Sequence, residues 1–222
     1  ISGKDSMFND FRGFTEKGES VHIAALPTLL ISAIGVIPDV RKAVTLDLKQ
    51  PGDSLYVIGE TNDELGASEY FTMLSDKSSQ IGHPMSNLGN TVPRVDTVKN
   101  MKAYVALAKA TQKGLVASAI SVGRGGLAVA LAKTAIAGKL GIKGDFTKLP
   151  GSAKDTDAVL FSESQGRILV SVNPKLKREF EKVHQGVALM LIGEVTKKES
   201  LELKMSGTSV NVPLKKLSTA YQ

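Results

Sequence analysis

Residues 114–138 read GLVASAISVGRGGLAVALAKTAIAG, and this stretch decides what kind of fold the chain can form. Its first part, LVASAISV at residues 115–122, is a continuous run of apolar and small residues, which is typical of a buried strand. The glycines that follow permit a tight turn at residues 123–126. Small apolar residues at 127–137 then favour a helix, which we expect to end at Gly138. The stretch therefore predicts a strand, a turn and a helix in direct succession.

Helices and strands also alternate before this stretch. Asp96 is a candidate N-cap for a helix that runs to Gln112, with Gly114 as its C-terminal cap. The apolar face of that helix is expected to consist of Val98, Met101, Val105, Leu107 and Ala108. Further upstream, we expect a strand at 54–58, a helix at 64–74 and a long ordered loop or mobile lid at 75–93, where glycine and proline are frequent.

Strands dominate after the stretch. We expect them at residues 142–146, 167–172, 187–195, 201–205 and 210–212, with one charged helix at 174–184. Helices and strands alternate in the middle of the chain, whereas strands follow one another at its end. This order predicts an α+β fold class with mixed α/β layers, in which helices pack on a mixed sheet.

The first 50 residues differ in composition from the rest. The run PTLLISAIGVI at residues 27–37 is nearly continuous and apolar, so it predicts a buried strand, which we interpret as the last strand of a preceding domain. Ile1–Asp10 form a polar glycine loop with a cation, a carboxylate and a hydroxyl close together, as in loops that bind phosphate or metal. Such loops normally follow a buried strand, and the sequence has no such strand before this loop. We therefore expect the chain to be a piece of a longer polypeptide.

Composition narrows the classes of function. The 222 residues are 42% hydrophobic and 23% charged, enough for one large domain, or for one domain and a remnant. The absence of cysteine excludes disulfides and thiolate metal sites. The absence of tryptophan and the low aromatic content leave few platforms for stacking bases, and the net charge of +6 is spread along the chain. We therefore expect small anionic ligands, with no nucleic acid and no membrane as partners.

Three short segments are candidate binding sites. GRGGL at 123–127 lies between a strand and a helix, where free N–H groups would face a phosphate or carboxylate; the alternative is that the glycines only permit a tight turn. LGASEY at 65–70 begins a predicted helix, where Ser68 and Glu69 contact a ligand or merely cap the first turn. FSESQGR at 161–167 places hydroxyls, a carboxylate and an arginine before a strand, and its alternative is a solvated turn.

Familiar catalytic patterns are absent from the sequence. His22, His83 and His184 lack the spacing of a metal site. GRGG does not fit the dinucleotide fingerprint, GKDS lacks a glycine of the phosphate-binding P-loop, and no Ser-His-Asp arrangement is present. From these residues alone, the chain is interpreted as an α+β domain that binds a phosphorylated small molecule, and its catalytic residues stay unknown.

Several segments together resemble, in the same order, the C-terminal part of phosphoribosylformylglycinamidine synthase. They are GKDSMFND, PTLLISAIGVIPDVRKAVT, KQPGD, GETNDELGASEY, GNTVPRVD, GLVASA with GGLAVALAKTAIAG, LFSESQGRILV and LIGEVT. That family belongs to a superfamily of ATP-dependent enzymes, which also contains aminoimidazole ribonucleotide (AIR) synthetase, selenophosphate synthetase and a hydrogenase maturation protein.

The resemblance implies two domains. Residues 1–45 would be the C-terminal remnant of an ATP-binding N-type domain, and residues 46–222 would form the AIR synthase-related C-terminal domain. The implied reaction converts formylglycinamide ribonucleotide, ATP and glutamine-derived ammonia to formylglycinamidine ribonucleotide in the cytoplasm, with Mg²⁺. The implied partners are a glutaminase subunit or domain, a small accessory subunit and the rest of the same polypeptide. The isolated chain is expected to be inactive.

The resemblance also implies binding residues. Gly3, Lys4, Asp5 and Ser6 match a glycine loop near the nucleotide, with Asp5 as a metal ligand. Residues expected to face the cleft between domains and to bind nucleotide or phosphate are Gly66, Ser68, Glu69, Arg124, Gly125, Gly126, Ser162, Glu163, Ser164, Gly166 and Arg167. For Arg124 and Arg167, the alternative is that they belong to the fold.

One segment departs from the family pattern. Where many members read His-Asp-x-Ser-Asp-Gly-Gly-Leu, this chain has Ile120 and Ser121 in place of the first pair and Arg124 in place of the second aspartate. The positive charge favours an anion over Mg²⁺ at this turn. Two other functions therefore stay open: a non-catalytic module for phosphate binding or docking, and another ATP-dependent enzyme of the superfamily.

Overall fold

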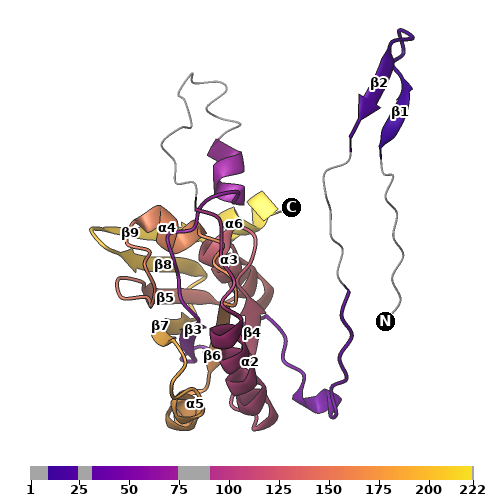
Figure 1. The fold of residues 1–222 in the computed structure, drawn as a ribbon. Coiled ribbons are helices and arrows are strands. Elements are labelled where there is room, and N and C mark those ends of the chain that lie inside the picture. Colours follow the sequence, from indigo (N-terminus) through magenta and orange to yellow (C-terminus); the bar gives the residue numbers. More distant parts are fainter. Residues whose placement is uncertain (1–9, 25–31, 75–90, 222) are drawn as a thin grey trace. The chain divides into compact units, whose positions relative to one another are not determined.

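A computed structural model describes residues 10–24, 32–74 and 91–221 of the chain (Figure 1). The chain divides into two compact units, residues 1–38 and residues 39–222. In the first unit, β1 (Phe11–Phe14) and β2 (Ser20–Ile23) form an antiparallel hairpin in which Phe11 pairs with Ile23. The second unit contains all the other helices and strands of the described residues. The expected assignment of 1–45 and 46–222 to two named domain types stays a prediction.

A seven-stranded mixed sheet organises the second unit. Its strands lie in the order β4-β6-β3-β7-β5-β8-β9. Their bounds are β3 (Ser54–Ile58), β4 (Ser118–Ser121), β5 (Gly141–Asp145), β6 (Ile168–Val172), β7 (Leu189–Thr196), β8 (Ser200–Met205) and β9 (Thr208–Pro213). The pair β5 and β8 is parallel, and every other neighbouring pair is antiparallel. The expected mixed sheet packed by helices is therefore confirmed.

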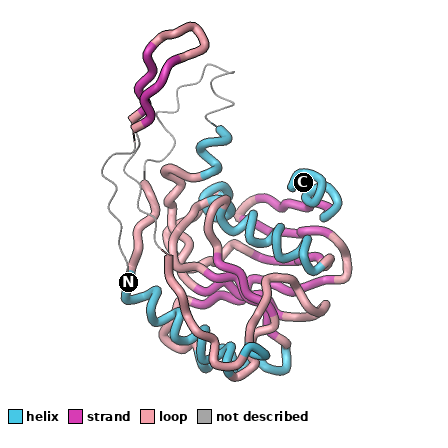
Figure 2. Tube along the Cα trace, turned by 90° about the vertical axis from the view of Figure 1, so that its right-hand side faces the viewer, coloured by secondary structure: helices cyan, strands magenta, loops and turns pink. Residues whose placement is uncertain are grey.

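Helices lie on both faces of this sheet (Figure 2). The α-helices are α2 (Thr97–Gln112), α3 (Gly126–Gly138), α4 (Thr156–Phe161), α5 (Lys177–Val183) and α6 (Leu214–Tyr221). Residues 69–74 are also helical, and short 3-10 helices lie at Val40–Lys42 and Pro174–Leu176. None of the helices in the described ranges is both long and apolar enough to cross a membrane.

Strand β3 shows how the two faces are built. Leu55 and Val57 belong to one buried cluster, which includes Leu127 and Leu131 of α3. Tyr56 and Ile58 point to the opposite face and join a second cluster, which includes residues of α2 and α5. Because successive side chains of a strand alternate between faces, a strand that is apolar throughout is stable only between two covered faces. This explains why the continuous run at 54–58 forms a central strand.

Most elements of the second unit appear where the sequence predicts them. Asp96 caps α2 by accepting a hydrogen bond from the backbone N–H of Lys99 at 3.0 Å. Helix α3 includes Gly138, and Lys139 in the left-handed region ends it. The helix expected at 64–74 begins only at residue 69. Helices α4 and α6 were not predicted, because their 6 and 8 residues are too few to show a clear helical period.

The expected apolar face of α2 is confirmed only for Leu107, which packs against the second cluster, and is wrong for most of its other residues. Ala103, Ala106 and Ala110 face the core, whereas Val98 and Met101 are exposed. Small alanine side chains let the helix approach the sheet closely, so the larger side chains are on the outer side.

The buried strand expected at 27–37 is also wrong as far as the structure describes it. Residues 32–37 form no strand, and Ile34, Val36 and Ile37 are exposed. Among the described residues, no strand pairs with this segment, so its apolar side chains have nothing to pack against. Residues 27–31 of the prediction, and residues 75–90 of the predicted loop, lie outside the described residues.

Candidate functional site

Three of the predicted segments meet at one carboxylate. Oε1 of Glu163 accepts a hydrogen bond from the backbone N–H of Gly125 at 2.8 Å and another from the backbone N–H of Glu69 at 3.0 Å. Glu163 lies in the loop between α4 and β6, Gly125 precedes α3, and Glu69 begins the helical residues 69–74. A carboxylate at two helix starts is stabilised by the N–H groups that lack an acceptor within the helix. The structure therefore brings these three segments together.

Arg124 and Glu69 add an exposed ion pair beside Glu163. Nε of Arg124 donates to Oε1 of Glu69 at 2.7 Å, and its Nη2 donates to the same oxygen. The Arg124 side chain is 84% exposed. The carboxylate of Glu69, through its hydrogen bond and its charge, raises the pKa of Arg124 above its usual value. Arg124 thus presents a permanent positive charge, and an exchange of partners would let it bind another anion.

Arg167, in contrast, is enclosed by its own chain. It is 1% exposed. Its Nε donates to the carbonyl of Ser164 at 3.1 Å, its Nη1 donates to Oγ1 of Thr61 at 3.1 Å, and its Nη2 donates to the carbonyl of Ser162. Burial lowers the pKa of Arg167 to about 10, while Glu64 and Glu163 oppose that shift. The guanidinium therefore stays charged at neutral pH and holds the loop that carries Glu163.

The neighbourhood of Arg167 contains two buried polar atoms that lack a partner. Glu64 is 6% exposed, and its Oε1 accepts from the backbone N–H of Arg94 at 3.1 Å. Among the described residues its Oε2 has no hydrogen-bond partner, and neither has the buried Oγ of Ser162. Thr61 and Glu64 escaped the sequence analysis. Glu64 is the second acidic residue of the segment DELGASEY, two residues before Gly66, but the presence of an acidic residue in a sequence does not show that it is buried.

The two other predicted serines support the local backbone. Oγ of Ser68 donates to the carbonyl of Leu65 at 2.7 Å and accepts from the N–H of Phe71 at 3.3 Å, so it caps the helix there. Oγ of Ser164 accepts from the backbone N–H of Asn62 at 3.0 Å and thereby joins the loop after β3 to the loop before β6. These hydrogen bonds satisfy both hydroxyls in their buried positions, as is typical of serine at a helix start and in a turn.

The predicted glycines permit close approaches. A Cβ on Gly66 would lie 2.8 Å from the carbonyl carbon of Thr91, and one on Gly166 would lie 2.2 Å from Oδ1 of Asn100. Gly126 has a φ of +66°, and a Cβ there would lie 2.7 Å from the carbonyl oxygen of Ser162. Gly126 therefore fixes how near the start of α3 can come to the loop of Glu163, whereas Gly66 and Gly166 allow close approach of Thr91 and of Asn100 in α2.

Some predictions cannot be placed. Gly3, Lys4, Asp5 and Ser6 lie outside the described residues, as does His83. Within the described ranges, no group of three or more His, Cys, Asp or Glu side chains could hold a metal ion. The carboxylates of Glu69 and Glu163 are already engaged by a guanidinium and by backbone N–H groups. The described residues therefore do not fit a Mg²⁺ centre.

A small pocket of about 290 Å³ adjoins the site. Asn62, Gln165 and the ion pair of Lys99 with Glu60 line it, together with the start of α2. Gln165 donates to the carbonyl of Glu163 at 3.0 Å, so the pocket and the carboxylate site share one loop. Polar atoms from several segments converge here, as in binding sites for small polar molecules.

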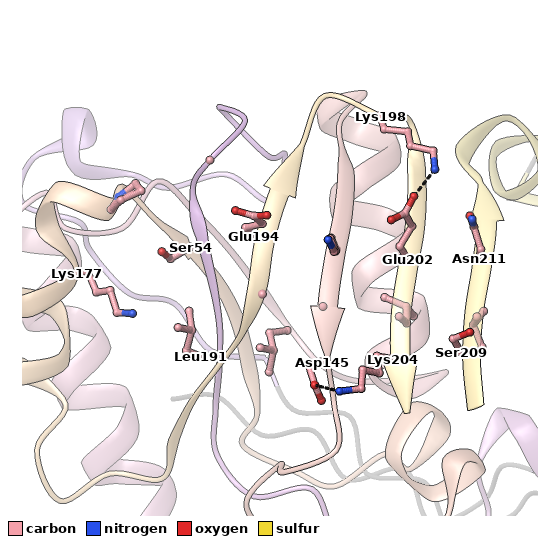
Figure 3. Close-up of a pocket in the computed structure, with 18 residues that line it drawn as sticks. Ser54, Asp145, Lys177, Leu191, Glu194, Lys198, Glu202, Lys204, Ser209 and Asn211 are labelled. Carbon is pink, nitrogen blue, oxygen red and sulfur yellow. Dashed lines mark hydrogen bonds and ion pairs between the residues drawn. The ribbon is translucent and has the colours of Figure 1, made fainter. Parts of the chain in front are cut away.

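A larger groove of about 1100 Å³ lies on the open half of the sheet, away from these residues (Figure 3). Charged side chains of β5, β7, β8 and the turn between β7 and β8 cover it, and some of them pair: Lys204 with Asp145 at 2.9 Å, and Lys198 with Glu202. None of the predicted site residues lines this groove. Its size therefore does not make it the candidate site, and its charges indicate a solvated sheet face.

Comparison with solved structures finds the same fold. "T. maritima PurL complexed with FGAR" matches 81% of this chain and 30% of that one, with a TM-score of 0.66 and 19% identity. "T. maritima PurL complexed with ATP" matches 81% and 28%, with a TM-score of 0.59 and 18% identity. The HypE hydrogenase maturation protein of E. coli matches 78% and 52%, with a TM-score of 0.53 and 18% identity. The chain thus spans less than a third of the length of these two PurL structures.

A sequence comparison defines the family. The profile of the C-terminal domain of AIR synthase related proteins matches residues 50–206, which contain β3 to β8 and every predicted site residue except the four at positions 3–6. By this match over more than half of its length, the chain belongs to the AIR synthase related family, through that family's C-terminal domain.

Proposed function

We propose that this chain is the C-terminal segment of an ATP-dependent C–N ligase that converts formylglycinamide ribonucleotide, ATP and glutamine-derived ammonia to formylglycinamidine ribonucleotide. The observation that carries the proposal is the meeting of Glu69, Arg124 to Gly126 and Glu163, where the chain leaves β4 and enters β6. These are the segments whose order resembles the synthase. The likeness in fold to a PurL bound to FGAR supports the same assignment.

In this proposal the site binds the phosphate of the ribonucleotide or of ATP. Arg124 is the anion contact, because its guanidinium is exposed and its present partner is another side chain. Gly125 and Gly126 place the start of α3 beside it, where the helix dipole favours negative charge, although the N–H of Gly125 already donates to Glu163. Arg167 is a positioning residue rather than a ligand contact. It holds the carbonyls of Ser162 and Ser164, and so the loop of Glu163.

The chemistry proposed for the full-length protein follows from phosphoryl transfer. The amide oxygen of the substrate attacks the terminal phosphoryl group of ATP, and ADP is the leaving group. Ammonia then adds to the activated amide carbon, and inorganic phosphate leaves from that carbon. This chain's own residues would hold the substrate phosphate and exclude water, which keeps the reacting groups in place. Mg²⁺ is expected for such a transfer, but only Asp5, outside the described residues, was assigned to it.

A second candidate is another ATP-dependent member of the superfamily. The likeness to HypE favours it, since this chain covers about half of that protein but less than a third of the PurL structures. The third hypothesis is a non-catalytic docking module for the glutaminase and small subunits. It predicts that the protein binds its ligand but releases no ADP, whether alone or with those subunits.

The test is ADP release by the full-length polypeptide that contains this chain, with ATP, ammonium and formylglycinamide ribonucleotide. We expect ADP release to require the ribonucleotide, and the 222-residue chain alone to show none. Arg124→Met should raise the KM for the ribonucleotide roughly tenfold with a smaller change in kcat, because it removes a charge-assisted contact.

Arg41→Met is the matched control. Arg41 is also an exposed arginine paired with a carboxylate, that of Asp39 at 2.9 Å, but it lies outside the site. Its kinetics should equal those of the unchanged protein. ADP release that ignores the ribonucleotide would refute the proposed reaction, and equal kinetics for the two variants would refute the assignment of Arg124.

A further inference from the structure

Helix α2 turns most of its large apolar side chains, but not Leu107, away from the core. Val98 and Met101 are 64% and 62% exposed, and Tyr104 and Val105 are 45% and 44% exposed. The spacing of 98, 101 and 105 places Val98, Met101 and Val105 on one stripe of the helix. Such a stripe normally faces a partner, which is why the sequence predicted it to be buried. Here the alanines fill that role on the opposite side, so the stripe is available to a second surface.

The stripe forms one wall of a groove. The groove has a volume of about 660 Å³ and runs between α2 and the end of α5. Val183 and Val187 contribute apolar side chains from the opposite wall. Helices α2 and α5 contact each other, as Figure 1 also shows at the lower edge of the second unit. A concave apolar strip between two helices has the shape that accepts a further helix.

The charges around the groove have one sign. Helix α2 contains three lysines and no acidic residue. Lys99 pairs with Glu60 at 2.9 Å, but within the described ranges Lys102 and Lys109 form no ion pair, and both line the groove. No Asp or Glu lines it. An occupant with carboxylates at the edge of its apolar stripe would therefore gain complementary charge.

We propose that this groove binds an amphipathic helix of a partner protein, with an apolar stripe on Val98, Met101 and Val105 and carboxylates opposite Lys102 and Lys109. A second copy of the chain fits less well, because two α2 helices would bring lysines to lysines. A lipid surface also fits less well, since the stripe lacks the Trp, Phe and Leu side chains that interfacial helices insert. The groove contains none of Glu69, Arg124 and Glu163, although Lys102 and Val187 also line the small pocket beside that site.

The test uses two synthetic helical peptides of about 18 residues, long enough to form helix on binding. Both carry leucines at the i, i+3, i+4 and i+7 spacing. One has glutamates beside the leucines and the other has lysines. We expect the glutamate peptide to bind the 222-residue chain in a salt-dependent manner, with NMR shifts at α2 and the end of α5, and the lysine peptide to bind at least roughly tenfold more weakly.

Variants separate the two parts of the groove. Met101→Ser should weaken binding of the glutamate peptide roughly tenfold, while leaving the melting temperature unchanged because Met101 is exposed. Lys102→Ser combined with Lys109→Ser should weaken binding and reduce its salt dependence. Val40→Ser is the matched control, since Val40 is an apolar residue that is 79% exposed and does not line the groove.

Four results would overturn the proposal. They are equal affinity for the two peptides, NMR shifts that map away from α2 and α5, binding of phosphatidylserine vesicles without binding of the glutamate peptide, and self-association that Met101→Ser abolishes. The ligand assays at Arg124 do not involve this groove, so failure here would leave the proposed function standing.

Discussion

Arg167 places a positive charge where water does not reach. A buried guanidinium loses its hydration, and only well-placed acceptors offset that loss. Arg167 has three such acceptors, and the charges of Glu64 and Glu163 oppose the lowering of its pKa. The side chain is therefore part of the folded loop and acts on the candidate site through Glu163.

We expect Arg167→Met to lower the free energy of unfolding by about 3–5 kcal/mol, because it leaves the acceptors and the nearby carboxylates without their partner. Urea denaturation of the 222-residue chain measures this change. Arg167→Lys should lose less, since it keeps the charge but not the planar set of donors. Arg124→Met is the control, and its midpoint should match that of the unchanged chain. An Arg167→Met protein with unchanged stability would show that the buried contacts do not support the fold.

The sequence singles out three segments that the structure brings together, but not the role of each residue. The segments 66–69, 124–126 and 162–167 were singled out from their glycines, hydroxyls and charges, and the structure brings Glu69, Gly125 and Glu163 together. Arg124 and Arg167 look alike in sequence. Only packing distinguishes the exposed guanidinium from the buried one. Binding of nucleotide or phosphate by these residues stays a prediction.

At the scale of elements, the start of α3 depends on Gly126. Its φ of +66° is in the left-handed region, and a Cβ would lie 2.7 Å from backbone atoms at the end of α4. Helices α3 and α4 contact each other, so this glycine sets their spacing. The turn GRGG therefore serves close packing, whether or not it also binds an anion.

Gly126→Ala should lower the free energy of unfolding by about 2–4 kcal/mol, through backbone strain and through displacement of α4. Gly123→Ala offers a matched control in the same turn. A Cβ on Gly123 would meet nothing within 4 Å, so its effect should stay within about 0.5 kcal/mol. Thermal unfolding followed by circular dichroism measures both variants. Equal melting temperatures would mean that α4 shifts freely to accommodate the methyl group.

Periodicity predicted elements better than it predicted faces. The strands β3 and β6 and the helices α2 and α3 lie close to their expected bounds, because each has a long apolar or capped pattern. The expected buried side of α2 is wrong except at Leu107, since hydrophobicity favoured valine and methionine where close packing selected alanine. For residues 32–37, an apolar run predicted a strand, but no partner strand is present among the described residues.

At the scale of the whole molecule, the two units differ in how well their strands are supported. β1 and β2 pair with each other and, within the described part of the chain, with no other strand. Phe11, Phe14 and Ile23 of this hairpin are exposed. A hairpin of two strands is marginally stable by itself in water, whereas the seven-stranded sheet has a core on each face.

Hydrogen exchange of the intact chain should therefore separate the units. The amides of Val21 and His22 should exchange at close to the rate of an unfolded chain, and those of Tyr56 and Val57 should be among the slowest. Mass spectrometry or NMR measures both in one sample. Comparable protection of β2 and β3 would contradict this view and would mean that something covers the hairpin.

The position of β3 in the sheet has a consequence for how the chain acquires its structure. Its partners β6 and β7 follow it by more than a hundred residues, and the parallel pair of β5 and β8 also joins distant segments. Contacts so far apart in sequence slow folding, because a long loop must close before they form. During synthesis at about 5–20 residues per second, the apolar β3 would leave the ribosome several seconds before either neighbour. A nascent chain of this topology therefore needs protection of that strand while its partners are still being made.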